Sequence, residues 1–349
     1  MTASVTDAVA AVDYDHFVTE PDGSTLPQSS SISSIQQMLE ALDVRPGHHV
    51  LEIGTGSGYT TGLLANLVGA AGLVRSVEVF ADLVPRAQTR LAAAGVTTAT
   101  VTNNDGYAGD PARAPYDRVV AWATPHLIPS AWIDQIAQDA VIVAPVKVAR
   151  LARAHAIVTI TVTGGRQMAV SARPGGYIEM HPEPVTVFGL PLRYVDAAHV
   201  PDGAEPWWLS SPALREDPDA ARRLLELLRS APGSSPAPLA ETEDLEDFTA
   251  WLYATVPAEL ATAGLSDRFA AIGAATQTGA AFLTDDELVT SGSPDAARVL
   301  TAWINQWRDE GRPGWSTVAG VVVPTAEGWG IRLTLQPANL GEGVEAMTQ

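Results

Sequence analysis

Residues 49–58 read HVLEIGTGSG, so a short apolar run passes directly into three glycines at alternate positions, and a helical pattern follows. Glycine lets the backbone turn sharply and lets a ligand approach closely. In a doubly wound sheet, a turn between a buried strand and a helix lies at the carboxyl edge, where ligands bind. The segment therefore predicts an α/β fold with a binding site at Gly54, Gly56 and Gly58.

Helix and strand patterns alternate on both sides of this segment, which is typical of a parallel sheet. Gly164-Gly165 separates two β-rich runs and predicts an antiparallel hairpin. The predicted fold class is α/β, with a doubly wound, mostly parallel, Rossmann-like sheet closed by that hairpin and followed by an α+β C-terminal extension. The expected helices are 35–42, 59–68, 81–93 and 129–137, and the expected strands are 49–53, 73–79, 98–102, 118–121, 140–145, 156–163 and 167–173.

The patterns change after the hairpin, and we divide the chain accordingly. Gly175-Gly176 allows either a flexible flap or an ordinary connection, and residues 231–238 (APGSSPAP) are typical of a linker. Helices are expected near 245–255 and 294–309, and strands near 317–323 and 329–335. The predicted parts are an N-terminal substrate-side segment (1–45), the cofactor-binding domain (46–195), a Pro- and Trp-rich connection with a helix (196–240) and the C-terminal extension (241–349).

Charge and composition exclude several classes of function. The net charge of −19 disfavours nucleic-acid binding, because an anionic surface repels phosphates. The chain has no cysteine, and its seven histidines show no metal-ligand spacing, so no metal site is expected. No apolar run is long enough to cross a membrane, and the first residues lack a signal pattern, so a cytoplasmic protein is expected. No feature selects an oligomeric state.

Acidic residues follow the second and third predicted strands. Glu78 ends the second strand, 22 positions after Gly56, where a carboxylate can accept hydrogen bonds from ribose hydroxyls. Asp105 follows the third strand and can accept a hydrogen bond from an adenine amino group. Each is also compatible with an ordinary strand end, but consecutive strand ends converge in space, which favours a nucleoside cofactor. The loop lacks the usual third-glycine spacing, so a dinucleotide oxidoreductase is disfavoured.

Several segments together resemble the protein-L-isoaspartate O-methyltransferase family over residues 31–146. They are SIS at 31–33, RPG at 45–47, VLEIGTGSGYTTGLLA at 50–65, NDGYAG at 104–109, APYDR at 114–118 and IP at 128–129. The resemblance implies an enzyme that uses S-adenosylmethionine (SAM) to methylate a carboxylate, leaving S-adenosylhomocysteine. The cofactor residues that it implies, with their neighbours in the same segments, are Glu52, Gly54, Thr55, Gly56, Ser57, Gly58, Glu78, Asn104, Asp105, Gly106 and Tyr107.

The site that binds the methyl-accepting carboxylate, which we call the acceptor side, is expected near Ser33. This residue matches the family serine beside the acceptor carboxylate. A carboxylate is already ionised at neutral pH, so positioning matters more than a general base. The Ser33 hydroxyl is expected to orient one carboxylate oxygen, and it also fits a helix N-cap. The expected substrate-binding residues are Ser31, Ile32, Gln36, Trp122 and Thr124.

Two segments depart from the family pattern. After Ser33 the family has a small residue, Pro, His and Met, where this chain has Ser34-Ile35-Gln36-Gln37, and Trp122 replaces a small residue after the fourth strand. With the added length, the chain resembles enlarged relatives of lanthipeptide and graspetide pathways. That resemblance implies methylation of an aspartate in a modified, macrocyclic ribosomal peptide, giving aspartimide or isoaspartate. Isoaspartate repair and non-catalytic SAM binding remain as alternatives.

Overall fold

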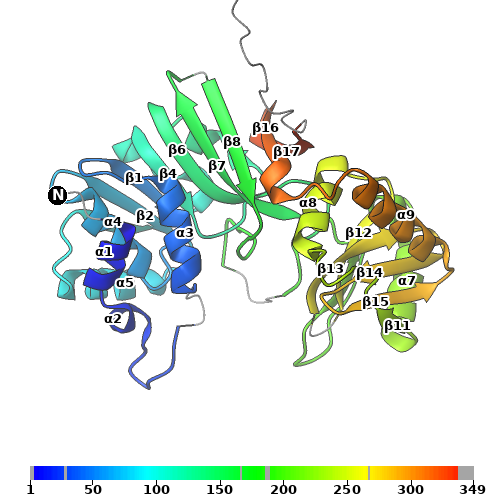
Figure 1. The fold of residues 1–349 in the computed structure, drawn as a ribbon. Coiled ribbons are helices and arrows are strands. Elements are labelled where there is room, and N and C mark those ends of the chain that lie inside the picture. The colour runs from blue at the N-terminus through cyan, green and yellow to red at the C-terminus, as the bar shows by residue number, and fades with distance from the viewer. Residues whose placement is uncertain (1–3, 27–29, 166, 185–188, 266–267, 337–349) are drawn as a thin grey trace, which may run out of the picture.

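The computed structural model describes residues 4–26, 30–165, 167–184, 189–265 and 268–336. It contains two β-sheets, each with its own helices, and Figure 1 shows the two units side by side. We call them the first unit, built on the ten-stranded sheet, and the second unit, built on the seven-stranded sheet.

The core of the first sheet is parallel, as the alternating pattern predicts. Its strand order is β3-β2-β1-β4-β6-β7-β8-β16-β17-β5. The pairs among β3, β2, β1, β4 and β6 are parallel, and β7 and β8 form the predicted antiparallel hairpin. The predicted α/β class is therefore confirmed. These strands are β1 (His49–Ile53), β2 (Leu73–Glu78), β3 (Ala99–Asn103), β4 (Tyr116–Ala121), β6 (Ile136–Lys147), β7 (His155–Thr163) and β8 (Gln167–Arg173).

Helices cover one face of this sheet, where alternate strand residues such as Val50, Val120 and Val143 pack against them. Helix α4 follows the glycine loop and is buried over most of its length because α1 and α2 lie outside it. The helix expected at 129–137 is shorter, since β6 already begins at Ile136. The helices are α1 (Val5–Ala11), α2 (Tyr14–Val18), α3 (Ile32–Leu42), α4 (Tyr59–Val68), α5 (Leu83–Ala93) and α6 (Ser130–Ile133), with short 3-10 turns η1 (Gly106–Ala108) and η2 (Pro111–Arg113).

The C-terminal hairpin joins this sheet. Strand β16 (Val318–Thr325) pairs with β8, and β17 (Gly328–Leu335) pairs with the short β5 (Ile128–Pro129), all antiparallel. Ile331 and Leu333 of β17 pack in one core with Leu51 and Ile142 from the second face of the sheet. The last strands of the chain therefore complete the first unit.

The second sheet is antiparallel, in the order β11-β15-β14-β13-β12-β10-β9. The segment expected to be a linker contains its edge strand, because residues 233–236 pair with β15. The strands are β9 (Ala197–His199), β10 (Trp207–Ser210), β11 (Gly233–Pro236), β12 (Leu260–Leu265), β13 (Arg268–Ala275), β14 (Gly279–Leu283) and β15 (Glu287–Gly292), with turns η3 (Pro212–Leu214) and η4 (Trp315–Thr317) nearby.

Helices cover both faces of the second sheet. Helix α7 (Pro218–Ser230) packs on one face, in a core with Leu209 and Phe282. Helices α8 (Leu245–Thr255) and α9 (Asp295–Asp309) cover the other, where Trp307 is 1% exposed. Helix α8 also contacts β17, so this core continues into the first unit.

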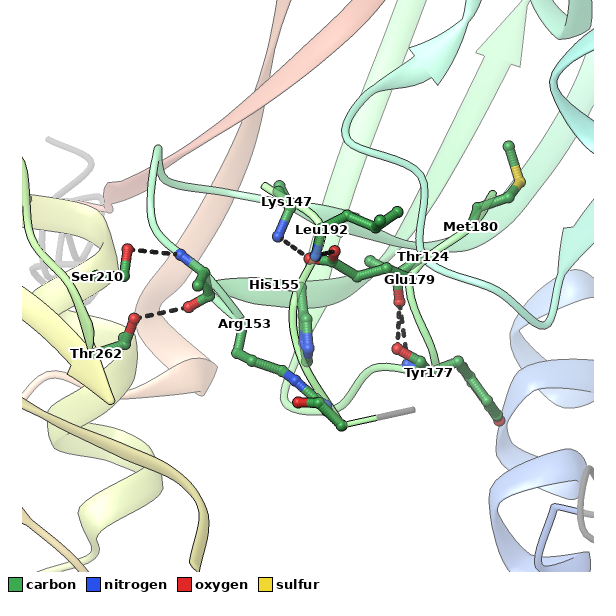
Figure 2. A network of polar contacts seen from close by, with 12 residues as sticks. Thr124, Lys147, Arg153, His155, Tyr177, Glu179, Met180, Leu192, Ser210 and Thr262 are labelled. Carbon is green, nitrogen blue, oxygen red and sulfur yellow. Dashed lines mark hydrogen bonds and ion pairs between the residues drawn. The ribbon is translucent and has the colours of Figure 1, made fainter. Parts of the chain in front are cut away.

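Residue 152 joins the two units by backbone hydrogen bonds. The Ala152 N–H donates to Ser210 Oγ at 3.0 Å, and Thr262 Oγ1 donates to the Ala152 carbonyl at 2.7 Å (Figure 2). Ser210 and Thr262 belong to neighbouring strands of the second sheet, β10 and β12. In the described part of the chain, no helix is long and apolar enough to cross a bilayer.

Candidate functional site

The glycine loop has the backbone that its sequence predicts. Gly54, Gly56 and Gly58 have φ values of +91°, +51° and +86°, a region that side-chain-bearing residues rarely adopt. The loop joins β1 to α4, and the N–H of Gly56 donates to the Glu78 carboxylate at 2.8 Å. The loop is thereby fixed to the end of the next strand.

Glu78 lies at the end of β2, as expected, and its side chain is nearly buried. Its second carboxylate oxygen accepts from the Phe80 N–H at 3.0 Å. Glu78 lines a cavity of about 540 Å³ together with Gly54, Gly56 and Gly106. The structure therefore brings three of the predicted strand ends to one cavity, which we call the cofactor pocket.

Glu52 lies next to the pocket but is not part of its lining. It is fully buried, and its carboxylate accepts hydrogen bonds from Thr60 Oγ1, Thr61 Oγ1 and Trp122 Nε1. Burial raises the pKa of Glu52, and these donors oppose the rise. Glu52 does not line the pocket and holds Trp122 in place, and its contact with the cofactor stays a prediction.

Thr55 and Ser57 also turn away from the large cavity. Thr55 Oγ1 lies 2.6 Å from Ser76 Oγ, and Ser57 Oγ accepts from the Tyr59 N–H at 3.2 Å. Both residues border a second, small cavity of about 30 Å³ on the other side of the glycine loop.

Residues 104–107 follow β3 as expected. Asp105 caps η1 by accepting from the Tyr107 N–H at 2.9 Å, and Trp132 Nε1 donates to the Gly106 carbonyl at 2.7 Å. Gly106 lines the cofactor pocket, and a Cβ there would lie 2.7 Å from Ile53 Cγ2. Cofactor contacts by Asn104, Asp105 and Tyr107 stay predictions.

A segment that the sequence left open forms the outer wall of the pocket. Residues 177–183, which we call the strap, contribute Tyr177, Ile178, Glu179, Met180, His181 and Glu183 to the lining. Backbone bonds tie the strap to the end of the fourth strand: the Thr124 N–H donates to the Ile178 carbonyl at 2.7 Å, and the Met180 N–H to the Thr124 carbonyl at 2.8 Å. The strap is therefore a fixed wall in this structure, anchored at Thr124.

Side chains complete this anchor (Figure 2). Thr124 Oγ1 donates to the Tyr177 carbonyl at 2.8 Å and accepts from the Tyr177 N–H at 3.1 Å. Lys147 forms an ion pair with Glu179, whose other oxygen accepts from the Leu192 N–H at 2.6 Å. Thr124 is 2% exposed and shapes the pocket through the strap, and its contact with the substrate stays a prediction.

Trp122 lines both the cofactor pocket and the small cavity, and its contact with the substrate stays a prediction. Its ring meets that of Tyr177 edge to face, with centroids 5.8 Å apart. Ser30 and Ile35 also border the small cavity, and sequence reasoning missed Ser30.

The remaining acceptor residues lie at the start of α3. Ser31 is the N-cap, so the N-cap interpretation of Ser33 is wrong: Ser33 lies in the first helical turn, exposed, with its Oγ 3.2 Å from that of Ser31. Ile32 is exposed and Gln36 half-buried. Substrate contacts by these four residues stay predictions.

Comparisons with known proteins identify the family. A family model described as protein-L-isoaspartate(D-aspartate) O-methyltransferase (PCMT) matches residues 1–163. A protein-L-isoaspartate O-methyltransferase of Gloeobacter violaceus is 36% identical over 194 residues, which are 52% of this chain and 87% of that protein. The chain belongs to this family. It is a SAM-dependent, protein-L-isoaspartate O-methyltransferase-like enzyme.

Other members of the PCMT family match over different shares of their length. One from Ignicoccus hospitalis is 40% identical over 113 residues, so the chain spans 54% of that relative. A solved structure titled protein-L-isoaspartate O-methyltransferase has a TM-score of 0.50 and 16% identity, over 94% of both chains. That likeness shows that the fold, with its second unit, recurs in another protein.

The pocket fits the cofactor of the PCMT family. Its volume of about 540 Å³ is in the range of small-molecule sites, about 300–1,000 Å³. Gly54 and Gly56 have no side chains to fill the part of the pocket next to the glycine loop, and Glu78 supplies a carboxylate beside them. These residues would hold the nucleoside part of SAM.

Proposed function

We propose that the protein transfers the methyl group of SAM to a carboxylate oxygen of an aspartyl or isoaspartyl residue in a peptide. The observation that carries this proposal is the pocket enclosed by the glycine loop, Glu78 and the strap, with Trp122 between it and the small cavity. The family's reaction requires a cofactor pocket with an acceptor beside it, and the small cavity next to Trp122 supports an approach of the acceptor from that side.

The reaction needs alignment more than acid–base catalysis. A peptide carboxylate has a pKa near 4 and is ionised at neutral pH, so no base has to remove a proton. One oxygen bonds to the methyl carbon while the carbon–sulfur bond breaks, and the electron pair stays on sulfur. The protein's part is to orient the oxygen and exclude water, a role that fits the Trp122–Tyr177 ring pair and the Ser33 hydroxyl.

We further propose a specific acceptor, an aspartate in a macrocyclic ribosomal peptide of the lanthipeptide or graspetide type. Its methyl ester would be attacked by the next backbone amide, losing methanol and giving an aspartimide that can hydrolyse to isoaspartate. Two residues support this choice. Ile35 and Trp122 depart from the family pattern, and both border the small cavity, so the acceptor side differs where the substrate would lie.

Repair of isoaspartyl residues is the second candidate. The observation that favours it is the solved protein-L-isoaspartate O-methyltransferase that shares the fold over 94% of both chains. A protein of that name therefore also carries a second unit, so the added length does not by itself exclude repair.

Mass spectrometry distinguishes these candidates. The enzyme and SAM are incubated with a short isoaspartyl peptide and, separately, with a cyclised precursor peptide that contains normal aspartate. Methyl gain on the cyclised peptide, followed by loss of methanol, is the expected result. Rapid methylation of only the isoaspartyl peptide would favour repair, and SAM binding without methylation of either peptide would favour a non-catalytic role.

A further inference from the structure

A third cavity, larger than the two already described, lies between the two units. It has a volume of about 890 Å³, and we call it the inter-unit cleft. The first unit contributes Arg153, His155 and residues 174–176, and the second contributes α8, residues 236–246 and parts of β13 and β14. Figure 2 shows Arg153 and His155 on the first-unit side, next to the chain that continues into the strap. The cleft is separate from the cofactor pocket.

Carboxylates dominate the rim of this cleft. Five acidic residues of the second unit line it and are exposed: Glu241, Asp244, Glu246, Asp285 and Asp286. A sixth, Glu243, is already paired with Arg308 and Arg312. Among the described lining residues, Arg153 is the only lysine or arginine. A partly enclosed surface of one sign concentrates ions of the opposite sign.

A tyrosine hydroxyl that reaches the same cleft is free to bind a ligand. Tyr253 lies on α8 and lines the cleft, and the residue is 6% exposed. Its hydroxyl has no hydrogen-bond partner among the described residues. Burial raises the pKa of Tyr253, so this hydroxyl stays protonated and can both donate and accept. A chain bound in the cleft would supply a hydrogen-bond partner for this hydroxyl.

One stretch of chain separates the cleft from the cofactor pocket. Residues 174–176 line the cleft, and the strap that follows at once lines the pocket. Gly176 lies flat on the His155 ring, since a Cβ there would come within 2.2 Å of it. A chain bound in the cleft would therefore lie against the same segment that closes the pocket.

A peptide fits this cleft better than a metal ion. In the part of the chain that the structure describes, no group of three or more acidic or histidine side chains is placed to hold a metal. The carboxylates are instead spread along the rim, over the ends of two strands and the start of α8. That spacing suits several cationic side chains on one extended segment.

We propose that the inter-unit cleft binds a lysine- or arginine-bearing segment of the peptide substrate, at a distance in sequence from the carboxylate that is methylated. This inference rests on the proposed function, because it assigns a second binding site to the same substrate. The site would add affinity and select among peptides through contacts outside the reacting atoms.

Fluorescence anisotropy tests the proposal directly. The probe is a labelled peptide with several lysines and one isoaspartate, and its acetyl-lysine form is the uncharged comparison. The full-length protein, saturated with S-adenosylhomocysteine, is expected to prefer the lysine probe, with weaker binding as salt rises. The variant E241Q/D285N/D286N should bind the lysine probe about tenfold more weakly, since each exposed pair contributes modestly.

Matched variants separate the cleft from the acidic surface in general. D202N/E216Q/D309N removes the same number of exposed charges from the second unit outside the cleft and should change binding by less than about twofold. Tyr253→Phe removes only the unpaired hydroxyl and should also weaken the lysine probe. Equal binding of the two probes, or equal loss in both charge variants, would overturn the inference.

The proposed function has a separate readout. Methylation of the acetyl-lysine probe tests the reaction without the cleft, because that peptide offers the acceptor and no cation. Binding of the lysine probe at the cleft, with methylation of neither this probe nor the cyclised precursor peptide, would contradict the proposed function and leave the cleft standing. Methylation together with equal binding of the lysine and acetyl-lysine probes would contradict the role of the cleft and leave the proposed function standing.

Discussion

Replacing Thr124 by valine tests whether the strap closes the cofactor pocket. Valine has nearly the shape of threonine but lacks the hydroxyl, which donates to the Tyr177 carbonyl and accepts from its N–H. Two hydrogen bonds contribute about 1–3 kcal/mol in net terms. The Thr124 backbone bonds and the Lys147–Glu179 pair persist, so we expect a loss in the lower part of that range.

This loss is expected to appear in cofactor affinity. In Thr124→Val the strap would open more often, and binding would have to restore it. A cost of about 1–2 kcal/mol weakens S-adenosylhomocysteine binding by about five- to thirtyfold, which calorimetry measures. Thr124→Ser keeps the hydroxyl and is the control. A folded Thr124→Val protein with the affinity of the parent would refute the role assigned to the strap.

Three further changes probe the loop, an ion-pair cluster and the shared core. Gly56→Val places a branched side chain at φ +51° on the pocket wall, so calorimetry should show loss of S-adenosylhomocysteine binding in a protein that still folds; unchanged affinity would contradict the site. Arg308 and then Arg312 lower the pKa of Glu243 from its ordinary 4.5, so its stabilisation is present above that pH and is lost as pH falls. Glu243→Gln should therefore lower the free energy of unfolding by about 1–2 kcal/mol at pH 7, and urea titrations should show the difference shrinking steadily as the pH falls below 4.5. A chain ending near residue 200 lacks β17, whose Ile331 and Leu333 are buried in the first unit, so it should melt at a lower temperature than the full chain; an equal melting temperature would contradict the shared core.

The cofactor pocket was largely predictable because its parts are local. Gly54 and Gly56 have positive φ values that glycine favours, and they follow a buried strand in the sequence itself. Glu78 and Gly106 follow the next two strands, and parallel strands bring such positions to one edge. The strap was not predictable in the same way, since its anchor joins Thr124 to residues more than 50 positions away.

The second sheet escaped prediction for a different reason. Strands β12 (LATAGL) and β14 (GAAFL) are buried along their whole length, so neither alternates between polar and apolar residues. Their alanines and glycines also have low β-propensity. These strands are buried on both sides here because α7 packs on one face of the sheet and α9 on the other.

The sequence by itself determined the parallel α/β core, the glycine loop and the carboxylates at the strand ends, because each depends on neighbouring residues and on backbone conformation. Only the tertiary structure decided which distant segments meet. It placed β16 and β17 in the first sheet, made residues 177–183 the outer wall of the pocket, and formed the inter-unit cleft. Pairing between strands far apart in the chain depends on packing of whole faces, and the individual strands carry no local signal for it.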